Sequence, residues 1–436
     1  MRIDKLNIKN FKGFEDESFS LNPQFTVFIG DNAKGKTAML QAMSVAMGSF
    51  FLGIDGIDSR AIQKNEVRVK TIDGQPRPQK PVVIEAEWRP EQEEMVLWKD
   101  YAIKPEMKWK RENIKNNTTS KDAKNIRTFA ESLLKASRDG SRVVFPLFAF
   151  YGTGRLWAIH EKLNYQKQEE GVKMAYAYAL SAKASPKEFL QWFKTQEDSV
   201  KKFEQPLDMA HLTAFKRTIT QLIPDDRWQD VAFDNKENEL TGIFTTDAGT
   251  KEKLKFSQLS DGFRNIIAIA GDLAYRCIQL NPHLKEEAVE KTPGIVLIDE
   301  LDMHLHPNWQ RRIVDDFKRA FPKIQFVATT HSPFIVQSLK ADELRILDEG
   351  RMIADDPLKN SIEEIAQQEM GVEEVKRSKE FIEMKSRAKE YFDLIKQGAP
   401  NEILHDAKQK LDELRIKYNN DPAYVALLES EMPKKD

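Results

Sequence analysis

A short stretch near the N-terminus constrains the fold of this chain more than any other. The apolar run Phe25–Ile29 leads into Gly30-Asp31-Asn32-Ala33-Lys34-Gly35-Lys36-Thr37, and a further apolar run begins near Ala38. The octapeptide fits the pattern G-x-x-x-x-G-K-[ST], and its flanks predict a strand before it and a helix after it. A phosphate-binding loop between a strand and a helix indicates an α/β fold.

The residue types of this loop match its chemistry. Gly30 and Gly35 let the backbone turn sharply, so that amide N–H groups and a helix N-terminus of roughly half a positive charge converge on one anion. Lys36 would reach the outer phosphates of a nucleotide, and Thr37 would place its hydroxyl on magnesium. The expected nucleotide contacts are Gly30, Asn32, Ala33, Lys34, Gly35, Lys36, Thr37 and Ala38.

Composition sets the broad class of protein. With 436 residues, 40% of them hydrophobic, the chain can bury one large core plus an appendage, or two or three modest domains. No run approaches the roughly 18 apolar residues of a membrane span, so we expect a cytoplasmic protein without a membrane partner. The net charge of -2 gives no global field for nucleic acid. The single cysteine, Cys277, stands at helical spacing with apolar neighbours and is expected to be buried.

Two carboxylates follow a second apolar strand. The run Ile295–Ile298 precedes Asp299 and Glu300, and the carboxyl ends of parallel strands are where α/β sheets bind ligands. Asp299 would hold magnesium, and Glu300 would act in catalysis by polarising the attacking water. An Asp-Glu pair is common by itself, but together with the phosphate-binding loop it becomes specific.

Two further motifs predict a nucleotide site shared between subunits. Ser260 stands in the N-cap position of a long amphipathic helix, and its hydroxyl with the amide of Gly262 would form an anion site. We expect this site to serve a second subunit, since it lies away from the chain's own loop. His331 ends another predicted strand and is followed by Ser-Pro, where it would sense or donate to a γ-phosphate.

The order of these motifs resembles the ABC-type ATPase head of the SMC, RecF and OLD group of AAA-family ATPases, over residues 1 to about 355. The resemblance implies an α/β head with a mixed central sheet, flanking helices and a β-lobe. It implies ATP and Mg2+ as ligands and two heads that sandwich ATP. By similarity, the residues acting in cis are Lys36, Thr37, Asp299, Glu300 and His331, those acting in trans are Ser260 and Gly262, and further nucleotide contacts come from Lys12 and Asp302.

Two departures from the family pattern bear on activity. Asp261 and Phe263 replace the Gly and Gln of the transporter signature, which favours the RecF-like branch. The family's glutamine near the end of the strand after the first lobe has no clear counterpart in Tyr151–Arg155, so hydrolysis is expected to be slow, with ATP acting mainly as a dimer clamp. The combination of 151–157 and 299–307 is most similar to the ATPases of the Septu antiphage defence system, which implies an HNH-type nuclease partner.

Within the predicted head, residues 1–356, two insertions are expected: a β-lobe with a basic segment at about 60–140, and a helical insertion at about 161–225. The basic segment, Lys104–Arg127, has eight basic residues against three acidic ones. With Trp98, Tyr101 and Trp109 nearby it would bind DNA by gripping phosphates and stacking bases, or it is simply a solvated face. A DNA-binding repair ATPase of the RecF kind therefore stays open as the alternative function.

The segment 357–436 is predicted to be helical, and 343–352 to form a closing β-hairpin before it. Its 3–4 spaced residues are Leu404, Ala407, Leu411, Leu414 and Tyr418. This seam either packs on the chain's own head or docks a nuclease or sister subunit. From residue 340 onward 17 basic and 23 acidic residues give a net charge of -6, which disfavours DNA contact, and no metal-binding acid cluster of a nuclease accompanies the tail.

Overall fold

The computed structural model describes residues 1–115, 117–154, 171–181, 187–223, 227–246, 248–347, 356–371, 386–387, 390–391, 394 and 400–417. The chain divides into two compact units, Met1–Gly371 and Val372–Asp436. Over the described residues, no helix combines the length and the apolar character needed to span a bilayer.

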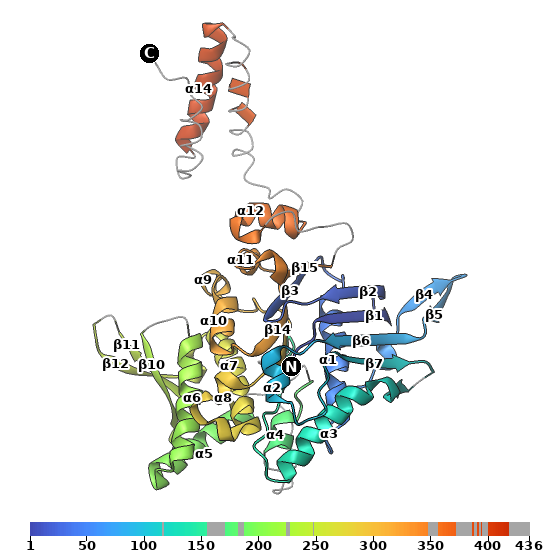
Figure 1. Cartoon of the computed structure of the whole chain (residues 1–436). Helices are drawn as coiled ribbons and strands as arrows, with labels where there is room; N and C mark the ends of the chain where they lie inside the picture. The colour runs from blue at the N-terminus through green and yellow to red at the C-terminus, as the bar shows by residue number, and fades with distance from the viewer. Residues whose placement is uncertain are drawn as a thin grey trace. The chain divides into compact units, whose positions relative to one another are not determined.

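A five-stranded parallel sheet forms the centre of the first unit (Figure 1). Its order is β15 (Leu344–Ile346), β3 (Phe25–Ile29), β14 (Ile324–Thr329), β13 (Gly294–Ile298) and β9 (Leu147–Tyr151), with every neighbouring pair parallel. Every residue of β3, β9, β13 and β14 is buried, as expected of a sheet covered on both faces. β15 pairs with β3 in parallel. The second strand of the hairpin predicted at 343–352 would fall in residues 348–352, outside the described part, so that hairpin stays a prediction.

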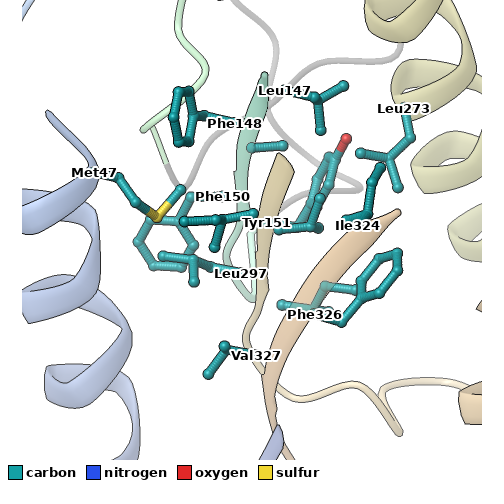
Figure 2. Close-up of a cluster of buried hydrophobic side chains, with 14 of the residues drawn as sticks. Met47, Leu147, Phe148, Phe150, Tyr151, Leu273, Leu297, Ile324, Phe326 and Val327 are labelled. Atoms are coloured by element: carbon teal, nitrogen blue, oxygen red, sulfur yellow. The ribbon is translucent and has the colours of Figure 1, made fainter. Parts of the chain in front are cut away.

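One long helix covers each face of this sheet. Figure 2 shows Met47 of α1 (Lys36–Phe51) on the same side of the strands as Phe148, and Leu273 of α7 (Asp261–Leu280) on the same side as Tyr151. Phe148 and Tyr151 of β9 point to opposite faces because side chains alternate along a strand. The two helices whose N-termini carry the predicted anion sites are therefore separated by the sheet.

An antiparallel β-lobe packs on the other side of α1. Its order is β2 (Phe14–Ser20), β1 (Lys5–Phe11), β6 (Val82–Trp88), β7 (Met107–Asn113) and β8 (Thr118–Thr119), and β1 and β2 form an N-terminal hairpin. The Trp109 indole donates to the carbonyl of Ala46 at 2.9 Å and ties β7 to α1. The lobe also carries a two-stranded ribbon, β4 (Val69–Ile72) with β5 (Gln75–Pro78), and the helices α2 (Gln92–Leu97) and α3 (Lys124–Arg138).

The predicted insertion is helical in its described part, with α4 (Val172–Tyr176), α5 (Lys187–Phe203) and α6 (Pro206–Leu222). A three-stranded sheet follows, β10 (Trp228–Asp234), β11 (Glu239–Thr245) and β12 (Lys251–Lys255). The remaining short helices of the first unit are α8 (Ala288–Lys291), α9 (Pro307–Gln310), α10 (Ile313–Ala320), α11 (Pro333–Val336) and α12 (Ile362–Glu364).

Residues 357–369 belong to the first unit. Ile365 is fully buried in its core, and the Gln337 side chain donates to the Asn360 carbonyl at 3.0 Å. In the second unit the described helix is α14 (Asn401–Lys417), in which Leu411 is buried and Leu404 is half-buried. The seam positions Leu414 and Tyr418 lie outside the described side chains.

The α/β class, the flanking helices and the β-lobe are confirmed, but the central sheet, expected to be mixed, is parallel in its described strands. The two strand directions are divided between sheets, since the central sheet is parallel and the lobe is antiparallel. This division gathers the ends of β3, β13 and β14 at one edge, next to the N-terminus of α1.

Candidate nucleotide site

The loop between β3 and α1 has the conformation of an anion cradle. Ala33 and Gly35 both have positive φ, 69° and 95°, which turns successive amides toward the same side of the loop. Gly35 is the N-cap of α1, and the helix begins at Lys36 with the Met39 amide donating to the Gly35 carbonyl at 2.8 Å. A 16-residue helix thus presents its N-terminus to the loop.

The Lys36 ammonium lies inside the loop. It donates to the carbonyls of Gly30 at 2.7 Å and Asp31 at 3.0 Å, and the side chain is almost buried. These carbonyls satisfy a cation that is otherwise costly to bury. The ammonium is thereby held where a phosphate would enter.

The predicted magnesium ligands Thr37 and Asp299 are in direct contact. The Thr37 hydroxyl donates to Asp299 Oδ2 at 2.8 Å, and the Thr329 hydroxyl donates to Oδ1 at 2.6 Å. A hydroxyl beside a buried carboxylate is an all-oxygen donor set, which fits Mg2+, a cation bound by few protein ligands together with phosphates and water. Over the described residues, no group of three His, Cys, Asp or Glu side chains converges, and the Nδ1 of His306 accepts from the Asn308 amide.

Glu300 and His331 border the same space. Glu300 has a left-handed backbone, φ 48°, and its amide donates to the Thr329 hydroxyl at 2.8 Å. His331 is exposed, and its amide donates to Asp302 Oδ1 at 3.1 Å. Asp302 also accepts from the Thr330 hydroxyl at 2.5 Å. Asp302, predicted as a nucleotide contact, therefore shapes the loop that carries His331.

A cavity of about 410 Å3 connects these side chains. It is lined by Lys12, Gly13, Asn32, Ala33, Gly35, Lys36, Thr37, Ala38, Gln41, Asp299, Glu300, Thr329 and His331. Gly30, Lys34 and Asp302 are predicted contacts that do not line it. A volume of this size suits a small-molecule ligand.

Sequence reasoning missed Gly13, Gln41 and Thr329. Gln41 accepts a hydrogen bond from the Lys12 ammonium, so it holds Lys12, a predicted nucleotide contact, at the cavity. Its position one helical turn after Thr37 is the signal that could have found it. Thr329 is the last residue of β14 and belongs to the same strand edge as Asp299.

Ser260 and Gly262 lie apart from this cavity. Ser260 is the exposed N-cap of α7, and its side chain makes no capping hydrogen bond. Gly262 is buried, and a Cβ there would stand 2.4 Å from the His304 carbonyl oxygen. The Asn265 side chain donates to the Met303 carbonyl at 3.1 Å. The start of α7 thus packs closely against the loop that follows Asp299 and Glu300 and is hydrogen-bonded to it.

The two tryptophans at the basic segment are not available for stacking. Trp98 and Trp109 are buried in the core, so the proposed interleaving of aromatics and cations is wrong there. Lys108 pairs with Glu87 and Glu106, and Lys110 with Glu112 and Asp122. Arg111 is buried, and burial lowers its pKa to about 10. These pairings favour the solvated face.

A phosphate-binding loop, a strand-borne Asp-Glu pair and a histidine at the neighbouring strand end define a P-loop ATPase head. The family comparison agrees, because the model described as AAA domain matches residues 5–225, half of the chain, and a second AAA-domain model, whose description adds AbiEii toxin and type IV TA system, matches residues 167–337. The chain belongs to the AAA-domain ATPase family.

Individual relatives extend this assignment. The chain is 24% identical over 399 residues to the "Retron Vc95 probable ATPase" of Vibrio cholerae serotype O1 biovar El Tor, covering 80% of this chain and 74% of that protein. It is 35% identical over 143 residues to the Septu protein PtuA of Bacillus thuringiensis, covering 30% and 35%. The expected likeness to Septu ATPases is confirmed. A solved structure of an Smc head bound to the C-winged helix domain of ScpA aligns with TM-score 0.46 and 17% identity over 78% of this chain and 93% of that one.

Proposed function

We propose that this chain is the ATPase subunit of a bacterial antiphage-defence complex, in which two heads close around ATP and the closed state controls an HNH-type nuclease. The observation that carries the nucleotide part is the cavity in which Lys36, the Thr37–Asp299 pair and Glu300 meet. The likeness to retron and Septu ATPases supports the defence role.

The groups around the cavity suit phosphoryl transfer to water. Lys36 moves its hydrogen bonds from the loop carbonyls to the outer phosphate oxygens, and each bond to a charged group is worth about 1.5–3 kcal/mol. When bound at Thr37 and Asp299, Mg2+ supplies charge neutralisation for the phosphates. Glu300 accepts a proton from water while the water oxygen bonds to the γ-phosphorus and the bond to the bridging oxygen breaks, giving ADP and phosphate.

A shared site is supported by the placement of Ser260. This side chain is exposed at the N-terminus of a 20-residue helix and lies outside the chain's own cavity. A hydroxyl and helix amides suit the γ-phosphate held by another head. Turnover is slow in this proposal, because Tyr151, at the position of the family's glutamine, is buried and does not line the cavity.

The test of nucleotide-driven pairing is sedimentation velocity with and without ATP and Mg2+. Wild type is expected to self-associate with ATP, Lys36→Ala to stay monomeric, and Glu300→Gln to form a longer-lived dimer because hydrolysis stops. Equal sedimentation of wild type with and without ATP would refute the pairing. Phosphate release under multiple turnover separates slow hydrolysis from none.

The partner role is assigned to the second unit. Its helix α14 would dock the nuclease through Leu404 and its seam neighbours. Copurification of the product of the adjacent gene with the full chain, and its loss on deleting residues 372–436, is the expected result. The deletion spares the first compact unit, so an unchanged melting temperature and ATP response serve as its control. Retained copurification would place the partner on the head.

The RecF-like alternative depends on the basic segment. Its exposed cations include Lys115 and Lys121, whereas Arg111 is a buried structural residue and is unsuitable for a binding test. Unchanged affinity for duplex DNA in a Lys115→Glu, Lys121→Glu variant is the outcome that our proposal predicts. A large loss that shrinks with added salt would instead support DNA binding.

A further inference from the structure

A buried polar network connects the nucleotide edge of the sheet to the middle of α7. The Tyr151 hydroxyl donates to Asp272 Oδ2 at 2.6 Å, and Arg276 Nε donates to the same oxygen at 2.8 Å. All three side chains are about 2% exposed. Burial, with the neighbouring Asp272 charge, raises the pKa of Tyr151 well above its ordinary value, so its hydroxyl keeps the proton that it donates.

At one end of the network, Tyr151 lies next to Asp299, the predicted magnesium ligand. Tyr151 is the last residue of β9, in register with Ile298, the last residue of β13. Its carbonyl accepts from the Asp299 amide at 2.8 Å. The backbones of Asp299 and Tyr151 are therefore hydrogen-bonded directly to each other.

The other end reaches the helix that carries Ser260. Asp272 lies twelve residues after Ser260 on α7, about 18 Å at 1.5 Å per residue. Arg276 donates to the carbonyls of Ala175 at 2.5 Å and Ala177 at 3.2 Å, so α4 is fixed to the same point. Figure 2 shows the Tyr151 ring on the α7 side of the strands, beside Leu273.

The network contains a buried ion pair between Asp272 and Arg276. An Asp–Arg pair with both side chains 3% exposed has lost its hydration, and such pairs stabilise a fold only when their remaining hydrogen bonds are satisfied. Asp272 Oδ1 is buried without a hydrogen-bond partner among the described residues. The carboxylate therefore depends on Tyr151 and Arg276, and its removal would leave Arg276 as an uncompensated cation.

We propose that Asp272 is a positioning residue which, through Tyr151, sets the placement of α7 and its Ser260 terminus according to the state of the Asp299 edge. This inference rests on the proposed pairing of two heads around ATP. It gives a role to the Tyr151 turn, which stands where the family has a glutamine. Tyr151 thus couples the nucleotide site to α7 without touching the nucleotide.

The alternative is that the network only fills the core. A matched control separates the two, because Tyr176 is equally buried and its hydroxyl donates to the Pro146 carbonyl at 2.6 Å, away from Asp272. Tyr151→Phe and Tyr176→Phe each delete one buried hydroxyl that makes one hydrogen bond. A packing role predicts the same behaviour for both variants beyond the loss of stability.

The experiment compares wild type and both variants in three assays. Binding of a fluorescent ATP analogue to dilute protein is expected to stay within twofold in all of them. ATP-driven self-association is expected to be about tenfold weaker in Tyr151→Phe, the scale of one lost hydrogen bond to a charged group, and unchanged in Tyr176→Phe. Hydrogen exchange of peptides covering 260–268 is expected to respond to ATP and Mg2+ in wild type and Tyr176→Phe, and to lose that response in Tyr151→Phe.

The outcomes distinguish this inference from the proposed function. If wild type fails to self-associate with ATP, head pairing is refuted, while the exchange response at 260–268 still decides whether the network works. An absent response in wild type, or a full response in Tyr151→Phe, overturns the inference. So does equal weakening of self-association by the two variants.

Discussion

Replacing Asp299 with asparagine tests the magnesium site with little disturbance of the fold. The two Asp299 oxygens accept from Thr37 at 2.8 Å and Thr329 at 2.6 Å. An asparagine oxygen keeps one of these bonds, and its NH2 group can donate to the other hydroxyl, because a hydroxyl both donates and accepts. We expect the ligand-free stability of Asp299→Asn to stay within about 1 kcal/mol of wild type.

The effect on ligand binding should be much larger. Loss of a hydrogen-bond partner of a metal ligand weakens a metal site by about 10–100-fold, so loss of the ligand charge itself should cost at least about a hundredfold. ATP with Mg2+ at a hundred times Kd stabilises wild type by about 2.7 kcal/mol, whereas the variant at the same concentration gains about 0.4 kcal/mol. At roughly 2 °C per kcal/mol, the melting shift falls from about 5 °C to about 1 °C.

Thermal denaturation is measured with ATP and Mg2+, with ATP and EDTA, and without ligand. These three conditions give the ligand-free stability and the melting shifts caused by ATP with and without Mg2+. Wild type should lose most of its shift in EDTA, and Asp299→Asn should show the same small shift with Mg2+ as with EDTA. A full Mg2+-dependent shift in Asp299→Asn would refute the assignment of this carboxylate. Unfolding of the ligand-free variant would refute the hydrogen-bond reasoning instead.

Three further predictions concern single positions. Gly242→Ala should destabilise the protein by about 3 kcal/mol or more and change its tryptophan fluorescence, because a Cβ would stand 1.6 Å from the Trp228 ring. Ala33→Gly should leave stability unchanged or raise it by up to about 1 kcal/mol in urea denaturation, since φ there is 69°; a clear loss would contradict the strain argument. Cys277 should resist alkylation at pH 8 until urea unfolds the chain, because burial raises the pKa of its thiol; labelling of the native protein would contradict its burial.

The local motifs were readable from sequence because each depends on neighbouring residues. The strand, loop and helix around Gly30–Thr37 follow from apolar runs, two glycines and one Lys-Thr pair. The apolar run before Asp299 predicted a buried strand for the same reason, and β13 forms there. The burial of Cys277 was likewise evident from its helical spacing with apolar residues.

Contacts between segments that are distant in the sequence could not be predicted from it. The basic segment alternates charged and apolar residues, and only the packing of β7 on α1 shows that Trp109 and Arg111 point inward. The parallel pairing of β15 with β3, which lies far from it in the sequence, had no local signal either. The lining residue Gln41 carries no motif of its own.

The sequence by itself predicted a phosphate-binding loop between a strand and a helix, since the turn geometry and the charges there are encoded within eight consecutive residues. Only the tertiary structure decided which distant residues meet behind that site. Tyr151 and Asp272 are 121 positions apart, and their hydrogen bond exists because α7 packs on the face of the sheet to which Tyr151 of β9 points. Contacts across such separations depend on the packing of the whole core, which no local pattern records.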